Sequence, residues 1–175
     1  MLTDEFEIDE FSLGGHDPDA DGRSLGKKAL VAAAIEVRGA GPGRLRLQLV
    51  GNSRGPTLQG FALATTAPGA IVHTDGLLSY RGLAKLGYDH QPRKQASLLE
   101  GEQMLPRVHR AISKLKAWMH RTHRGVSDQH LPVYLDEYVF RHNRRGTPMA
   151  AFQTLLGLGA AHQPTTYNQI TQRAT

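Results

Sequence analysis

Two aspartates stand at positions where α/β proteins place their chemistry. The short apolar run 70–74 is followed by Asp75 and a glycine, which is the pattern of a buried strand ending in a turn. Ligands of open α/β sheets bind beyond the carboxyl ends of strands, so Asp75 is a candidate functional residue. Asp9 is the second, because residues 6–11 predict another strand that ends near a Gly-Gly turn. Each alone is typical of an ordinary turn or strand end, but we expect the two carboxylates to lie together.

A basic helical segment, residues 104–122, supplies a third candidate group. Apolar residues recur there at the spacing that buries one stripe of a helix, and they are Val108, Ile112, Leu115 and Met119. His109, Ser113 and Lys116 fall on the neighbouring stripe, because seven residues make nearly two turns. Between residues 107 and 124 there are six Lys or Arg, three His and no acid. This face predicts either a contact with nucleic acid or a solvated charged surface.

The distribution of charge favours an anionic partner. The chain of 175 residues has a formal net charge of +5, yet residues 1–22 contain eight acids and no Lys or Arg. All 21 basic residues therefore lie in the rest of the chain, against eight acids. Arginine outnumbers lysine, and the guanidinium fork suits phosphate, so nucleic acid is the leading candidate partner. A merely soluble basic surface is the alternative.

Composition narrows the classes of protein. With no cysteine, the chain has no disulfide and no thiolate metal site, so any metal ligands are oxygen or imidazole. No apolar run is long enough to span a membrane, and the acidic start is unlike a signal peptide. We therefore expect a cytoplasmic protein. Residues 1–175 are predicted to form a single domain, with a flexible loop at 14–26 and a frayed tail at 163–175.

The elements that must position these residues follow a mixed α/β order. Strands are predicted at 6–11, 28–37, 44–50, 70–74 and 88–93. Helices are predicted at 57–66, 78–86 and 104–122, from residue 131 to a stop within 141–146, and as a last amphipathic helix at 148–156. The periodicity of 28–37 fits either a strand or a helix. We interpret it as a strand because of its Val and Ile content, paired with the alternating run 44–50 as a hairpin.

Four motifs, in order, resemble the ISXO-like catalytic domain of bacterial insertion-sequence transposases. They are IDEFSLGG, VHTDGLLSYRGLAKLGYDHQ, LPRVHRAISKLKAWMHRTHRGV and HLPVYLDEYVFRHNRR. The resemblance covers nearly the whole chain, from about residue 7 to about residue 156. Those domains are RNase H-fold enzymes of the DDE transposase and integrase superfamily. The resemblance implies an α/β fold with an RNase H-like mixed five-stranded sheet, flanked by helices, and a helical C-terminal part.

The resemblance also implies a set of catalytic residues. The first acid, on the first strand, corresponds to Asp9, and the second, at the end of the fourth strand, to Asp75. The third residue of the metal site comes from a helix and is followed seven positions later by a lysine, which here gives His109 and Lys116. Histidine replaces the usual glutamate, although members of this group carry other residues there. Glu137 on the next helix is the rival third carboxylate, with a surface or helix-capping role as its alternative.

Such sites use two divalent ions, Mg²⁺ or Mn²⁺, for in-line displacement at phosphorus. Asp9 and Asp75 would hold the ions, and His109 would either complete one coordination shell, position water, or act as a general acid or base. Imidazole suits Mn²⁺ better than Mg²⁺. Lys116 would contact a phosphate or a terminal base pair. Further basic residues would clamp the DNA backbone, namely Arg107, Arg110, Lys114, Arg121, Arg124, Arg144 and Arg145.

The implied function is metal-dependent cleavage and strand transfer in DNA transposition. Its partners would be element ends and target DNA, with no membrane, and the protein would be a nucleoid-associated homo-oligomer in bacteria. Two alternatives stay open: a catalytically silent, truncated remnant that binds DNA non-specifically, and a stand-alone RNase H-type nuclease. Full-length relatives carry an N-terminal zinc-binding and helix-turn-helix region. Because such a region needs cysteines and this chain has none, we expect either a catalytic fragment or a truncated remnant.

Overall fold

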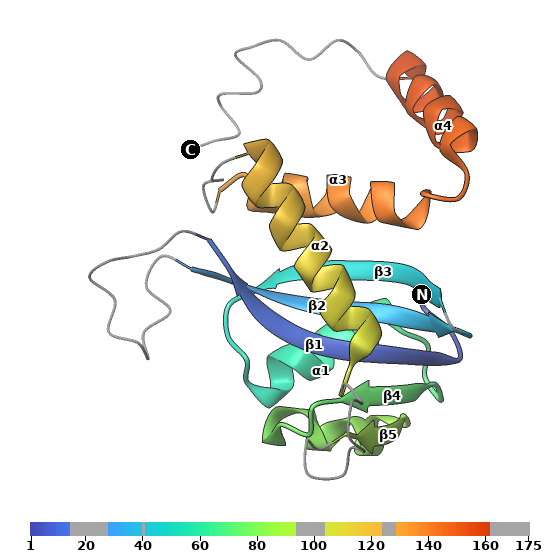
Figure 1. Ribbon diagram of the computed structural model, residues 1–175. Coiled ribbons are helices and arrows are strands. Elements are labelled where there is room, and N and C mark those ends of the chain that lie inside the picture. The colour runs from blue at the N-terminus through green and yellow to red at the C-terminus, as the bar shows by residue number, and fades with distance from the viewer. Residues whose placement is uncertain (15–27, 40, 94–103, 124–128, 162–175) are drawn as a thin grey trace.

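A five-stranded mixed sheet forms the centre of the molecule (Figure 1), with strand order β3-β2-β1-β4-β5. The strands are β1 (Glu5–Leu13), β2 (Ala29–Arg38), β3 (Gly41–Val50), β4 (Ile71–Thr74) and β5 (Asp89–Pro92). β1, β2 and β3 form an antiparallel meander, whereas β4 pairs in parallel with both β1 and β5. This topology confirms the predicted α/β fold and is consistent with an RNase H-like sheet.

The computed structural model describes residues 1–14, 28–39, 41–93, 104–123 and 129–161. The predicted tail at 163–175, nearly all of the predicted loop at 14–26, and Arg124 lie outside the described residues. Within the described part, no helix is long and apolar enough to cross a lipid bilayer.

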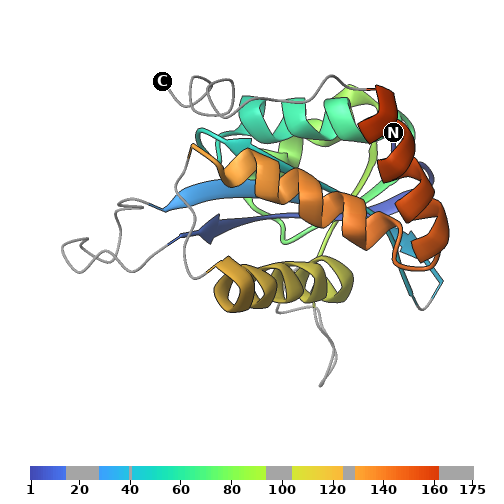
Figure 2. The ribbon, with the colours of Figure 1, turned by 90° about the horizontal axis from the view of Figure 1, so that it is seen from above.

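Helices lie on both faces of the sheet. They are α1 (Gly55–Thr65), the 3₁₀ helix η1 (Leu78–Leu86), α2 (Pro106–His123), α3 (Leu131–Asn143) and α4 (Pro148–Ala161). α2 and α1 lie on opposite faces, and α3 runs beside β3 (Figures 1 and 2). The predicted order of strands and helices is confirmed, with boundaries that move by a few residues. The short helix predicted at 78–86 is a 3₁₀ helix.

The alternation of side chains along the central strands produces two hydrophobic cores. Phe11 of β1 and Val31 of β2 pack towards α2 and α3, whereas Phe6 and Ile8 pack towards α1 and η1. The predicted apolar stripe of α2 is confirmed, since all four of its members are buried. As a result, neighbouring residues of β1 face different layers.

The last helix differs from its prediction. α4 forms, but none of its residues is buried. Its large apolar side chains are each more than half exposed, and they are Met149, Phe152, Leu155, Leu156 and Leu158. Figure 1 shows α4 apart from the sheet. Spacing alone predicted an apolar face, yet the segment has no charged residue to define an opposite polar face, and no described element covers it.

Candidate active site

Asp9 and Asp75 lie on neighbouring parallel strands. β1 and β4 pair with Glu5 opposite Ile71 and Glu7 opposite His73, and continuing this register by two residues brings Asp9 level with Asp75. Asp75 stands directly after the end of β4, where its Oδ1 accepts a hydrogen bond from the amide of Leu77 at 3.0 Å. The intervening Gly76 has φ +83°, which only glycine adopts easily. The turn therefore fixes the carboxylate at the edge of the sheet.

His109 of α2 contacts Asp9 on the face of the sheet that α2 covers. Its Nε2 lies 3.2 Å from Asp9 Oδ2, with side-chain exposures of 41% and 15%. The other oxygen of Asp9 accepts a hydrogen bond from the Glu10 amide at 2.9 Å. Burial raises the pKa of Asp9 above its usual value, the charge of Asp75 adds to the rise, and His109 offsets part of it. The ionised form of Asp9 is thus disfavoured here, and a bound cation would stabilise it.

Glu7 explains why α2 begins where it does. Its carboxylate is 1% exposed, and Oε2 accepts hydrogen bonds from the amides of Arg107 and Val108, both at 2.8 Å. Oε1 pairs with the Arg107 guanidinium at 3.2 Å. Glu7 therefore caps the positive end of the helix. Because Glu7 and Asp9 share one face of β1, this cap also brings His109 over Asp9.

Glu10 is a third carboxylate close to the two aspartates, and it was missed by the sequence analysis. It projects towards the other face of the sheet, where the hydroxyl of the fully buried Tyr80 donates a short hydrogen bond to its Oε2. Burial raises the pKa of Glu10, the Tyr80 bond lowers it, and the charges of Asp9 and Asp75 raise it further. Tyr80 lies in η1, which follows the Asp75 turn, so this bond ties that turn to β1.

Lys116 lies further along the same stripe of α2 as His109. Its ammonium is 5.3 Å from the centre of the Phe11 ring. Because Phe11 lies two residues beyond Asp9 on the same face of β1, the stripe from His109 to Lys116 follows the strand. The remaining basic residues predicted on this helix to contact DNA, Arg110, Lys114 and Arg121, are exposed.

Other predicted residues lie elsewhere or hold the fold together. Glu137 does not join the cluster: it is 40% exposed and pairs with Arg141 one turn later on α3, at 2.8 Å. The Arg107 guanidinium donates hydrogen bonds to Glu7 and to the carbonyl of Gly39, so its interactions hold the fold together. Arg144 stacks on Phe140, with 4.3 Å from its guanidinium carbon to the ring centre.

The donor atoms at this site suit a hard divalent cation. Asp9 and Asp75 supply carboxylate oxygens from adjacent strands, and the imidazole of His109 touches the first of them. Among the described residues, however, no group of three or more Asp, Glu, His or Cys side chains is close enough to hold a metal ion. The residues therefore fit a divalent ion in charge and ligand type, as a pair of carboxylates and not as an assembled triad.

The sequence of the chain matches the family model of the ISXO2-like transposase domain over residues 1–143. The match extends from β1 to the end of α3 and includes Asp9, Asp75, His109 and Lys116. It ends before α4. No curated protein matches the chain.

Proposed function

Because the chain belongs to the family of ISXO2-like transposase domains, we propose that its site cleaves and joins DNA strands with the help of divalent metal ions. Transposases of the DDE type are polynucleotidyl transferases that generally use such ions. The observation that carries the proposal is the placement of Asp9 and Asp75 on adjacent parallel strands, with His109 in contact with Asp9.

Each residue has a distinct task in this proposal. Asp9 and Asp75 would hold the cations, and bound cations would supply activation of the attacking hydroxyl and stabilisation of the leaving oxygen. His109 holds Asp9 Oδ2 in place by its contact at 3.2 Å. Lys116 stands nearly two turns further along the same stripe of α2 and binds a phosphate of the same DNA, while the exposed basic residues of α2 attract the backbone.

The first experiment compares wild type with Asp75→Asn. Mn²⁺ binding is measured by calorimetry, and cleavage and joining are measured on duplex DNA with a free 3′-hydroxyl. Asp136→Asn is the matched control, because Asp136 is an exposed aspartate on α3. We expect Mn²⁺ binding and cleavage in wild type and in the control, and neither in Asp75→Asn. An Asp75→Asn variant that cleaves DNA like wild type overturns the metal site.

The products of the reaction distinguish a strand transferase from a nuclease. A strand transferase links the 3′-hydroxyl of a donor strand to the target, whereas a nuclease of the RNase H type releases only hydrolysed products. Products longer than either substrate strand therefore support the transferase, and hydrolysis alone supports the nuclease.

A catalytically silent DNA-binding domain is the second candidate function. It is favoured by the lack of a three-ligand group among the described residues. This function predicts DNA binding without Mn²⁺ binding in the wild-type chain. His109→Glu then becomes the informative variant, because it places a third carboxylate beside Asp9. Metal binding gained by His109→Glu would show that only the third ligand is missing.

A further inference from the structure

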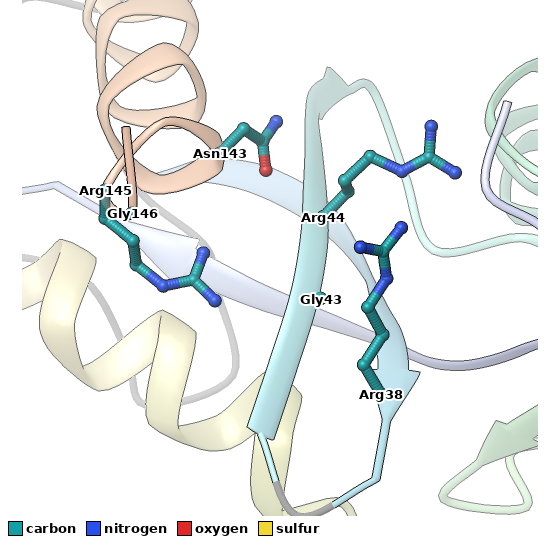
Figure 3. Close-up of a pocket in the computed structure, with 6 residues that line it drawn as sticks. All are labelled: Arg38, Gly43, Arg44, Asn143, Arg145 and Gly146. Carbon is teal, nitrogen blue, oxygen red and sulfur yellow. The ribbon is translucent and has the colours of Figure 1, made fainter. Parts of the chain in front are cut away.

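A second polar site lies at the hairpin end of the sheet, remote from Asp75. Six residues line a cavity of about 250 Å³ there. Figure 3 shows that they come from β2, β3 and the segment at the end of α3. They are Arg38, Gly43, Arg44, Asn143, Arg145 and Gly146. We call this site the arginine pocket. Three of its six residues carry a permanent positive charge, so its chemistry is that of an anion site.

Buried Glu36 holds two of these arginines in fixed positions. Its Oε2 lies 2.8 Å from Arg38 Nε, and its Oε1 lies 2.7 Å from Arg44 Nη2. Burial alone would raise the pKa of Glu36, but the hydrogen bonds and charges of Arg44 and Arg38 outweigh it and lower the pKa to about 2. Glu36 is therefore ionised at neutral pH. Glu36 pairs with two of the three guanidinium groups, and the charge of Asp4 also acts on Arg44. The three guanidinium groups outnumber these two carboxylates, so the pocket keeps a net positive charge.

Two further contacts shape the arginine pocket. The side-chain amide of Asn143 accepts a hydrogen bond from the Leu45 amide at 2.7 Å and donates one to the Leu45 carbonyl at 3.1 Å. This pair fixes the end of α3 against β3 and so places Arg145 at the pocket. Gly43 leaves room for Glu36, since a Cβ at this position would lie 2.7 Å from a Glu36 oxygen.

The positive charge of the pocket continues towards α2. Burial lowers the pKa of His142, and the charges of Arg145 and Lys114 lower it further. Both cations therefore lie near the same imidazole, one from α2 and one from the end of α3. The exposed basic side of α2 and the arginine pocket thus approach each other around His142.

The distance from the pocket to the candidate active site suits a single DNA duplex. Asp9 pairs with Ala33 and Ala33 with Leu47, so Gly43 lies two strands across and four residues along from Asp9. With strands about 4.8 Å apart and a rise of about 3.3 Å per residue, the separation is about 16 Å. That length corresponds to about five base pairs of B-form DNA.

We propose that the arginine pocket binds a backbone phosphate of the DNA on which the Asp9 and Asp75 site acts. A guanidinium presents paired donors that match two phosphate oxygens, and Glu36 keeps two such groups in place before binding. Phosphates carry no sequence information, so this contact sets the position of the duplex without selecting its sequence. The identity of the ligand as DNA rests on the proposed function.

The test combines Arg38→Gln with Arg145→Gln. Arg44 stays in place and keeps its hydrogen bonds to Glu36, so the buried carboxylate remains paired. The matched control combines Arg54→Gln with Lys85→Gln, two exposed cations next to α1 and in η1. Binding of a labelled duplex is measured by fluorescence anisotropy at several salt concentrations, in EDTA, so that no metal and no chemistry contribute.

We expect the pocket variant to bind DNA about fivefold more weakly near 0.15 M salt, with a salt slope smaller by about one, as for one lost phosphate contact. The control keeps the wild-type slope. When a single methylphosphonate is moved along the duplex, one position weakens the binding of wild type but not that of the pocket variant, and the positions contacted by α2 weaken both. A pocket variant with wild-type affinity and slope overturns the proposal.

Inorganic phosphate distinguishes a small-anion site from a DNA contact. If phosphate binds wild type in calorimetry while the pocket variant binds DNA as wild type does, the pocket serves a free anion and the DNA assignment is wrong. The outcome is separate from that of the proposed function. Asp75→Asn tests catalysis and leaves the salt slope intact, whereas the pocket variant changes binding without metal.

Discussion

Glu36 and Asp9 are two carboxylates of the same sheet with opposite surroundings. Glu36, at the hairpin end, is 3% exposed and is met by two guanidinium groups, so its pKa falls to about 2. Asp9, in the middle of β1, is mostly buried and has one imidazole partner. Burial and the charge of Asp75 raise its pKa, and His109 offsets only part of that rise. A carboxylate with complete partners stabilises the fold. One with incomplete partners is left able to bind something else.

The same contrast occurs within β1. Glu7 accepts two backbone amide hydrogen bonds and one guanidinium, and its role is to hold α2. Asp9 lies two residues further on the same face and contacts α2 through His109. The number and charge of the partners separate the two roles, since both residues are carboxylates on the same face of the same strand.

The largest expected effect comes from replacing a carboxylate by its amide, once at Asp9 and once at Glu36, and comparing the rates of DNA cleavage. Asp9→Asn should lower DNA cleavage by at least about a hundredfold, because removal of even an outer-shell partner at a metal site costs 10- to 100-fold. The Glu36→Gln variant, measured under conditions where it is folded, should cleave DNA at a rate within a few fold of that of wild type. Cleavage rates with Mn²⁺ in excess provide the comparison. Equal losses in the two variants would abolish the distinction between the sites.

The two variants should rank the other way in stability, with Glu36→Gln the more destabilised. Glu36→Gln should lower the free energy of unfolding by about 1 to 2 kcal/mol, a modest value because solvent screens the partly exposed Arg38 and Arg44. Asp9→Asn should not lower it, because burial already disfavours the charged form. Urea unfolding at pH 7 measures both. A destabilised Asp9→Asn variant would indicate that Asp9 is structural too.

The pH dependence of stability follows from the direction of the shift at Glu36. Its pKa is about 2 in the folded chain against a usual value of 4.5, so the folded state favours the ionised form. The resulting stabilisation is fully present above pH 4.5 and is lost as the pH falls towards 2. Unfolding of wild type and Glu36→Gln should therefore converge in acid. Curves that stay parallel down to pH 2 would contradict this assignment.

His109→Gln should move the acidic limit of cleavage to higher pH. The charge of His109 lowers the pKa of Asp9, so its loss leaves burial and Asp75 to raise that pKa further. Activity should fall more at acidic than at alkaline pH, and a pH–rate profile of both proteins measures the difference. A uniform loss at every pH would assign His109 a role apart from the charge of Asp9.

The smallest effect is expected at Tyr80. Tyr80→Phe removes the hydrogen bond to Glu10 and should cost about 1 kcal/mol of stability. Tyr88→Phe is the matched control, because Tyr88 is also buried and its hydroxyl accepts a hydrogen bond from the Thr66 hydroxyl and donates one to the Thr66 carbonyl. Both variants should lose similar stability in urea unfolding, but only Tyr80→Phe should weaken Mn²⁺ binding. Equal metal binding would confine Tyr80 to packing.

The sequence predicted what local patterns encode. Alternation gave the hairpin of β2 and β3, apolar spacing gave the buried stripe of α2, and a glycine turn placed Asp75 at a strand end. Contacts between distant residues carry no such signal: Glu7 caps a helix that begins about 100 positions later, and Asn143 bonds to Leu45. Glu10 was missed because strand alternation assigns it to the face opposite Asp9. The apolar spacing of α4 predicted a helix but not what would cover it.

The bond between Asn143 and Leu45 also bears on how copies of this chain behave at high concentration. β3 is an edge strand, and exposed edges invite strands of other molecules to add to the sheet and aggregate. The amide of Asn143 occupies both the donor and the acceptor of Leu45, in the middle of that edge. The opposite edge, β5, is four residues long and ends in Pro92, which has no N–H to offer. Both margins of the sheet are thus protected against edge-to-edge growth.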